Sequence, residues 1–251
     1  MKFCISLTTI PSRINTIYKT IDSINNQIVK PDLIYLSIPY LYKRFNSKID
    51  NKTLNKLTFE NVKIIRCEDY GPSTSLLGPI NEIIDNYEFM IILNDDHLYD
   101  ENITDIMLRN YKKKKANYSF YLQKIFDVSM AQTADAFLIR SDLLLGANEF
   151  YEKYVKNNKN LRIDDDLWIS IYLQKIMNSK IINLIDEFRN RTNKKIIYTV
   201  HTTNDALINT VHKRNVFWNR RKIAKFEIIK FKIKKFIELF FNNRKNNIIN
   251  L

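Results

Sequence analysis

The chain has 251 residues, of which 45% are hydrophobic and 12% aromatic, enough for one large domain or one domain with an appendage. No apolar run approaches the roughly 18 residues that a membrane-spanning helix needs, so we expect no such helix. The glycines Gly71, Gly78 and Gly146 cannot form the motifs of dinucleotide-binding, P-loop or serine-hydrolase sites. The sparse histidines and cysteines form no cluster, which argues against structural zinc.

Positive charge is concentrated at the C-terminal end. Residues 213–251 contain 12 Lys or Arg and 2 Glu, and so carry +10 of the net charge of +13. We therefore predict a near-neutral domain over residues 1–212, followed by a basic segment over 213–251. Cys4 and Cys67 lie in separate strand-like segments, which favours free thiols in a reducing compartment. The early polar residues do not resemble a signal peptide, and we expect a cytoplasmic protein.

The first third of the chain alternates between strand and helix patterns. Residues 2–7 predict a buried strand, and residues 33–38 predict a second one. Between them, isoleucines recur at helical spacing, at positions 14, 17, 21, 24 and 28. This order predicts a right-handed parallel crossover. Residues 40–60 predict a surface loop with one helical turn, and residues 62–67 a third strand.

The remaining elements follow the same alternation. We expect a central buried strand over 89–93, a helix over 102–115, a short strand over 136–140, helices over 141–154 and 162–177, and strands over 181–185 and 196–200. Such an order indicates α/β architecture. The part of the chain up to about Tyr99 and the part after it should share one sheet.

The central strand ends in Asn94, Asp95 and Asp96. Unpaired carboxylates do not enter a core, because burying their charge is very costly. At the end of a central strand they would face the crevice where α/β sheets bind ligands, and their oxygens suit a hard divalent cation. The alternative is a turn after the strand, since Asn and Asp are common turn residues.

This pattern resembles the DxD-type metal-binding motif of family-2-like glycosyltransferases with the GT-A fold. The usual motif has three aspartates, and Asn94 replaces the first one here. The resemblance implies a Rossmann-like, mixed but mostly parallel sheet flanked by helices, a nucleotide-sugar donor (a UDP-sugar first) and Mn²⁺ or Mg²⁺. It implies Asp96 as the first metal ligand and Asp95 as the second. Asn94 and Asp95 would also face the nucleotide.

Two earlier loops carry the same resemblance. Thr8 to Arg13 matches the family's entry loop, which places Thr8 and Arg13 near the nucleotide. The run around Asp69, Gly71 and Pro72 resembles a D-Y-G-P-x-T-K pattern in which Asp69 would contact the base or ribose. Gly71 and Pro72 would turn the chain into a helix whose N-terminus favours phosphate. Ser75 stands where that pattern has lysine. Ordinary strand-to-helix turns are the alternative for both loops.

Asp164, Asp165 and Asp166 open a predicted helix. The helix dipole and capping explain one acidic residue there, and capping alone is the alternative for all three. The run resembles the family's acidic pair below the acceptor site, one of which is the general base. Asp165 and Asp166 fill that pair. A late histidine on the metal is also common in the family, and His201 follows a predicted strand in the matching place.

The basic segment contains an imperfect amphipathic helix. Phe226, Ile229, Ile233, Phe236, Ile237 and Phe240 form one stripe, whereas Ile228, Phe231 and Leu239 lie on the far side. Basic helices with aromatic residues bind membrane surfaces, so we expect contact with the anionic inner face of a membrane. The alternative is a helix packed on its own domain. No nucleic-acid-binding module is present in the sequence, so no nucleic-acid partner is expected.

Two functions follow from these features. The first is a metal-dependent glycosyltransferase that moves a sugar to a glycan or other hydroxyl acceptor, with inversion if an aspartate is the general base. A nucleotidyltransferase is a near variant, but it usually needs a triphosphate loop that the sequence lacks. The second function is a weakened GT-A-like domain that serves as a membrane-surface scaffold, because Asn94 and Ser75 replace charged residues.

Overall fold

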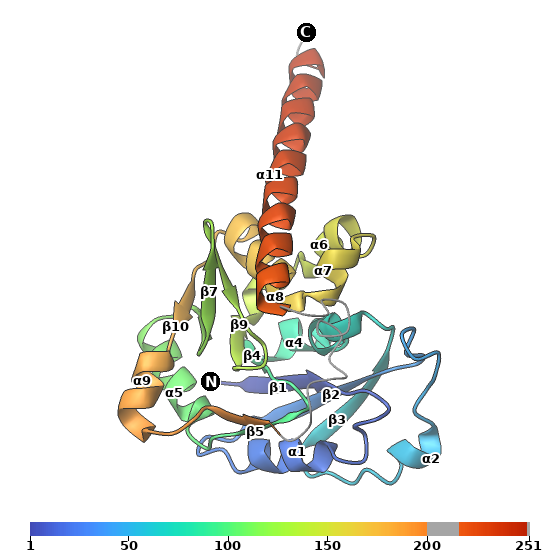
Figure 1. Ribbon diagram of the computed structural model, residues 1–251, viewed down its shortest axis with the longest axis vertical. Helices are drawn as coiled ribbons and strands as arrows, with labels where there is room; N and C mark the ends of the chain where they lie inside the picture. Colours follow the sequence, from blue (N-terminus) through green and yellow to red (C-terminus); the bar gives the residue numbers. More distant parts are fainter. Residues whose placement is uncertain (200–215, 250–251) are drawn as a thin grey trace.

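The computed structural model describes residues 1–199 and 216–249, with a seven-stranded sheet at its centre (Figure 1). The strand order is β10 (Ile181–Asn183), β6 (Asn117–Ser119), β9 (Phe137–Arg140), β4 (Phe89–Ile92), β1 (Phe3–Thr8), β2 (Leu33–Pro39) and β3 (Val62–Cys67). Only β9 runs antiparallel to its neighbours β4 and β6, and the other described pairings of this sheet are parallel. The mixed, mostly parallel sheet is the predicted one, and it contains strands from both halves of the chain.

The central strands are apolar because helices cover both faces of the sheet. Successive side chains alternate between faces, so Phe89 and Ile91 enter one core cluster, whereas Met90 and Ile92 enter the other. The first cluster includes residues of α1 (Ile17–Asn25), α5 (Ile103–Lys113) and α9 (Ile185–Thr192). The second includes α3 (Thr74–Leu77), α4 (Ile80–Asn86), α6 (Ala147–Phe150), α7 (Lys159–Ile163) and α8 (Asp165–Ile171).

Two short pairs of strands and several irregular turns complete the domain. β5 (His97–Tyr99) pairs with β11 (Ile197–Thr199), and β7 (Leu122–Ile125) forms a hairpin with β8 (Val128–Ala131). α2 (Asn51–Leu54) is the single helical turn expected within residues 40–60. The 3₁₀ turns are η1 (Gly71–Ser73) and η2 (Ser141–Leu143), and the π-helical turns are η3 (Tyr151–Val155) and η4 (Tyr172–Ile176).

Several predicted helices are wrong in extent. α1 ends at Asn25, so Ile28 lies beyond it and is exposed. The helix predicted over 141–154 is a 3₁₀ turn, a short α-helix and the start of a π-helical turn. The helix predicted over 162–177 is divided at Asp164, which ends α7 and caps α8. Periodicity locates an apolar face, but it does not reveal such breaks.

α11 (Val216–Ile249) begins against the domain and then projects away from it (Figure 1). Ala224, Ile228 and Phe231 are buried in the same cluster as α6, α7 and α8. The segments on either side of residue 212, the predicted boundary, therefore share a core. The predicted apolar stripe lies on the other side of α11, and all its members are exposed: Phe226, Ile229, Ile233, Phe236, Ile237 and Phe240.

Candidate active site

A cavity of about 480 Å³ lies where β1, β2, β3 and β4 end. The carboxyl ends of parallel strands are where α/β sheets bind ligands. The predicted site residues that line this cavity are Thr8, Arg13, Asp69, Gly71, Pro72, Asn94, Asp95, Asp96, Asp165 and Asp166. The fold thus brings all four predicted clusters to one place. His201, the remaining predicted ligand, lies outside the described residues.

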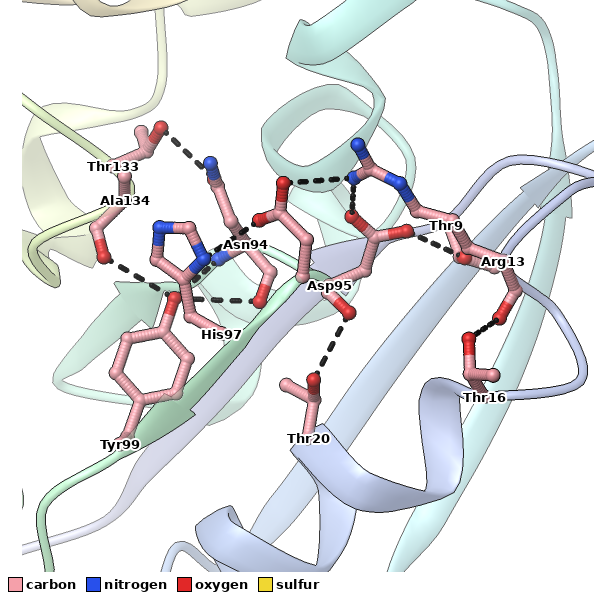
Figure 2. Close-up of polar contacts among 11 residues, drawn as sticks. Thr9, Arg13, Thr16, Thr20, Asn94, Asp95, His97, Tyr99, Thr133 and Ala134 are labelled. Carbon is pink, nitrogen blue, oxygen red and sulfur yellow. Dashed lines mark hydrogen bonds and ion pairs between the residues drawn. The ribbon is translucent and has the colours of Figure 1, made fainter. Parts of the chain in front are cut away.

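Arg13 joins the loop after β1 to the two carboxylates that follow β4 (Figure 2). Its Nη1 lies 2.6 Å from Asp95 Oδ1 and 3.1 Å from Asp96 Oδ2. The Thr9 hydroxyl donates to the other oxygen of Asp95 at 2.6 Å, and the Thr20 hydroxyl donates to its backbone carbonyl. Both Asp95 oxygens are therefore engaged, and this buried carboxylate holds Arg13 and the β1 loop in position.

Asp96 is engaged differently. Its Oδ1 lies 3.0 Å from Nδ1 of His97, and neither of these two buried atoms has another hydrogen-bond partner within the described part of the chain. Burial raises the pKa of Asp96, but the His97 and Arg13 charges outweigh burial and the net pKa is lowered. Burial lowers the pKa of His97, but Asp96 outweighs that effect and the net pKa is raised. Asp96 is thus an ionised carboxylate at neutral pH.

Asn94 and Tyr99 fix the turn between β4 and β5 (Figure 2). The Asn94 backbone N–H donates to the Tyr99 hydroxyl at 2.8 Å, and this hydroxyl lies 3.3 Å from the carbonyls of Asn94 and Ala134. The Thr133 hydroxyl donates to Asn94 Oδ1 at 3.3 Å. The predicted strand-to-turn transition is present, and its hydrogen bonds hold Asn94 at the cavity wall.

The turn after β3 is built around the carboxylate of Asp69. Asp69 Oδ1 accepts from the Gly71 N–H at 2.8 Å, and Oδ2 accepts from the Lys43 N–H at 2.7 Å. Gly71 has φ +66°, and a Cβ there would lie 3.3 Å from the Arg162 carbonyl oxygen. Glycine is therefore favoured by both backbone conformation and space. The helices that follow, η1 and α3, are short, so neither offers much of a helix dipole to a phosphate.

Asp164 to Asp166 form a second acidic wall of the cavity at the start of α8. Asp164 Oδ1 caps α8 by accepting from the Leu167 N–H at 3.2 Å, so capping accounts for this one aspartate. Arg220 of α11 donates to Asp164 through Nε at 2.9 Å and Nη2 at 2.6 Å, and to Asp166 through Nη2 at 2.8 Å. Asp166 Oδ1 also accepts from the Thr133 N–H at 2.8 Å.

Asp165 has no hydrogen bond to another side chain among the described residues, although it is buried. Burial and the neighbouring carboxylates of Asp166 and Asp164 raise the pKa of Asp165 well above its usual range. Burial raises the pKa of Asp166 as well, but the Arg220 guanidinium opposes this rise. The two predicted base candidates therefore differ, because Asp166 is held by Arg220 and the Thr133 N–H, whereas no described side chain donates to Asp165.

Sequence reasoning missed the cavity's other basic residues. Lys43, Arg44, Lys159 and Arg162 line the cavity and are exposed, and Arg220 reaches it from a distant helix. They lie in a polar loop, a short helix and the basic C-terminal segment, where lysine and arginine are common. Only the position of Lys159 and Arg162 just before the Asp164 run could have drawn attention to them.

The residues beside Asp96 are compatible with a magnesium or manganese ion that is bound together with a diphosphate. Within residues 1–199 and the described part of α11, no three His, Cys, Asp or Glu side chains are grouped to hold a metal. Magnesium is often bound by one or two carboxylates while substrate phosphates supply the other oxygens. Asp96 lines the cavity and is a carboxylate of this type, and His97 Nδ1 lies 3.0 Å from its buried Oδ1.

The sequence matches no protein-family model and no curated protein sequence. Solved structures do match. TarS residues 1–349 from S. aureus, alone and in complex with UDP, align with a TM-score of 0.50 and 14% identity, over 91% of this chain and 71% of that chain. A longer TarS structure aligns with a TM-score of 0.51 and 14% identity, over 88% of this chain and 43% of TarS. The chain therefore has the GT-A-like fold that the sequence resemblance predicted.

Proposed function

We propose that the protein is a glycosyltransferase that moves a sugar from a nucleotide-diphosphate sugar to a hydroxyl acceptor. The observation that carries this proposal is one cavity lined by both acidic runs, by the Asp69 turn and by several cations. Its volume of about 480 Å³ lies within the usual range for small-molecule sites. In a GT-A-like fold, this position at the strand ends suits a nucleotide.

Asp69 and Tyr42 are the proposed contacts for the nucleoside. Asp69 is fixed by two backbone N–H groups, and Tyr42 lines the same cavity with a buried hydroxyl that has no hydrogen-bond partner in the described residues. A ribose hydroxyl or base N–H would satisfy such groups. Thr8 and Asn94 line the cavity wall nearby. A UDP-sugar is the first donor to test, since TarS crystallised with UDP.

Charge in the cavity suits a diphosphate. The short helices after Gly71 give little dipole, so side chains must supply most of the positive charge. Lys159 and Arg162 are the proposed phosphate contacts, because α7 packs against η1, where Gly71 and Pro72 lie. Together they replace the lysine that is absent at Ser75.

Asp96 is the proposed ligand for Mg²⁺ or Mn²⁺, with Asp95 holding Arg13 beside it and His201 as an additional candidate. When bound, such an ion neutralises charge on the departing nucleoside diphosphate. Arg13 lies against both carboxylates and reduces their repulsion, so Asp96 stays ionised and can face a cation. Asn94 contributes an amide oxygen where the usual motif has a carboxylate.

Asp165 is the proposed general base. It would accept the proton of the acceptor hydroxyl while that oxygen attacks the anomeric carbon and the bond to the diphosphate breaks. A base works best when its pKa approaches the working pH, and burial raises the pKa of Asp165. Asp166 is bound by Arg220 and Thr133 and so has less freedom to take the proton. Direct attack assisted by a base gives inversion.

Ligand-dependent thermal stability tests this proposal. The protein should be stabilised by a UDP-sugar in the presence of Mn²⁺, because a ligand that binds only the folded state raises its stability. GDP-, CDP- and ADP-sugars serve as comparisons, and the Asp69→Asn variant should lose the response. A scaffold without donor binding would show no stabilisation by any nucleotide sugar.

We further propose that the exposed stripe of α11 contacts an anionic membrane surface. The described helices include none that is long and apolar enough to cross a membrane. The stripe is bordered by Lys230 and Lys234 on one side and by Lys225 and Lys232 on the other, as the helical spacing requires. Apolar residues can enter the headgroup region while lysines reach lipid phosphates.

The charges on α11 favour lipid over a second copy of this helix. Glu227 is held by Asn158 and Asn160, and Glu238 by Tyr154 and Lys153, so both described acidic residues face the domain. Two such stripes packed together would bring lysines into contact without acidic partners. An anionic leaflet supplies the opposite charge.

Vesicle binding with matched variants tests this surface. Wild-type protein should bind vesicles that contain phosphatidylglycerol, and binding should weaken at high salt. Phe236→Ser should weaken binding about tenfold, since burial of a Phe side chain is worth about 1.5–3 kcal/mol. Leu239→Ser is the control, because Leu239 is also exposed but lies off the stripe. Equal loss in both variants, or none in either, would contradict the assignment.

A further inference from the structure

Arg220 is unusual because it belongs to the basic C-terminal segment and yet lines the proposed active site. Its side chain is 11% exposed and makes three contacts with two carboxylates. Figure 1 shows the start of α11 beside α8, the helix that Asp164 to Asp166 open. Charged side chains are rarely buried without a partner. The two nitrogens of Arg220 that contact both oxygens of Asp164 form a bidentate pair, which fixes the orientation of both side chains.

The three adjacent aspartates need such a partner. All three are buried, and carboxylates this close repel one another in a site of low dielectric. The charged or donor groups beside the run are Arg220 from α11 and, from the β8–β9 loop, the Thr133 N–H and Asp135. Arg162 and Lys159 from α7 line the same cavity. Of these, only Arg220 has an ion pair with the aspartate run among the described contacts.

The contacts divide the run unequally. Asp164 receives Arg220 and the Leu167 N–H, and Asp166 receives Arg220 and the Thr133 N–H. Asp165, between them in sequence, receives no side-chain donor in the described structure. The arginine thus fixes the two outer carboxylates and leaves the middle one available.

We propose that Arg220 is a positioning residue of the transferase site, which holds Asp164 and Asp166 so that Asp165 is the carboxylate that takes the acceptor proton. This inference rests on the proposed function. It makes α11 a structural part of the catalytic centre, in addition to its proposed surface role. Arg220 acts through the aspartates and need not touch either substrate.

Kinetics of matched variants provide the first test. Arg220→Gln should lower kcat at least tenfold while the donor KM changes less than about threefold, because the diphosphate and nucleoside contacts lie elsewhere. Arg220→Lys should recover part of the loss, since lysine keeps the charge but not the fork of donors. Arg221→Gln is the control, because the adjacent Arg221 is exposed. In an Asp164→Asn, Asp166→Asn background, Arg220→Gln should have little further effect.

Carbon-13 NMR of the aspartate carboxyl groups provides a second test that does not need activity. Loss of Arg220 should raise the titration midpoint of Asp166 by about one pH unit or more, as removal of a neighbouring arginine predicts. The Lys variant serves for both tests if the Gln variant does not fold. An unchanged midpoint, or an equal loss of kcat in Arg221→Gln, would overturn the proposal. Absence of transfer by wild-type protein would overturn the proposed function, while the NMR result would still decide the role of Arg220.

Discussion

The cavity has two acidic walls, and each contains an arginine that bridges two aspartates. Arg13 contacts Asp95 and Asp96 after β4, and Arg220 contacts Asp164 and Asp166 before α8. Each wall also has one carboxylate with fewer partners. On the first wall this is Asp96, which is ionised beside His97, and on the second it is Asp165, whose pKa is raised.

The two walls differ in the carboxylate that has fewer partners, which is Asp96 on the first wall and Asp165 on the second. Asp96 has a lowered pKa and suits a permanent negative charge that faces a metal. Asp165 lacks a cationic partner of its own and suits a group that gains and loses a proton. An arginine that contacts two aspartates therefore stands beside a proposed metal ligand on one wall and beside a proposed base on the other. The predictions below separate these two roles.

Asp165→Asn should have the largest effect. Loss of a positioned base lowers kcat by about 10²–10⁴-fold, and donor binding should persist because the proposed donor contacts are on other elements. Steady-state kinetics and donor titration measure both quantities. Asp142→Asn is a matched control, since Asp142 is exposed and does not line the cavity. If Asp166→Asn abolishes transfer and Asp165→Asn does not, then Asp166 is the general base and the assignment of Asp165 is wrong.

Arg13→Gln should destabilise the fold. Removal of one partner of a buried ion pair costs about 3–5 kcal/mol, because it leaves the other charge buried and uncompensated. Both Arg13 and Asp95 are buried, and among the described side-chain contacts the Asp95 carboxylate would keep its hydrogen bond from Thr9. Urea unfolding measures the change. Arg109→Gln is the control, because the Arg109 side chain is 56% exposed in its ion pair with Asp105, and such a pair should contribute little. Equal losses in both variants would argue against a structural role for the Arg13 bridge.

Asp96→Asn should remove most of the stimulation by Mg²⁺ or Mn²⁺. We expect transfer to fall about 10²-fold, comparable to loss of one strong transition-state contact, while the thermal midpoint in the absence of ligand changes little. Activity as a function of metal concentration is the measurement. A variant that retains full metal-stimulated activity would remove Asp96 from the site.

Asp135→Asn should have the smallest effect, and that effect should depend on pH. Burial and the charge of Asp166 raise the pKa of Asp135 from 3.8 to about 6. A raised pKa contributes stability below pH 3.8 that is lost as pH rises through about 6. The variant should therefore be more stable than wild type at pH 8, by on the order of 2 kcal/mol, and similar to it at pH 4. A pH-independent difference in unfolding free energy would contradict this explanation.

Much of the architecture could be predicted because it depends on local patterns. The apolar strands that end in polar residues gave the sheet, its mostly parallel order and the position of the cavity. The prediction of one helix over 141–154 was wrong, because short consecutive turns bury Phe150 and Tyr151 as well as one long helix would.

The predicted site residues share one cavity, but their partners could not be predicted. Arg13 was named because it belongs to a recognisable loop next to the first strand. Arg220 was missed because α11 packs on α8 through contacts between residues far apart in sequence. The sequence offered membrane contact and packing on the domain as alternatives for the basic segment. The structure is compatible with both, because Ile228 and Phe231 pack on the domain while the stripe on the other side of α11 is exposed.

Release of nucleoside diphosphate from a panel of nucleotide sugars tests the central claim most directly. Wild-type protein, assayed with simple glycan acceptors and with Mn²⁺ or EDTA, should release nucleoside diphosphate from at least one donor, with UDP-sugars the first candidates. Release should require the metal and should be lost in both Asp96→Asn and Asp165→Asn. Folded wild-type protein that releases none from any donor, or releases it equally in EDTA and in both variants, would contradict the assignment of the two walls.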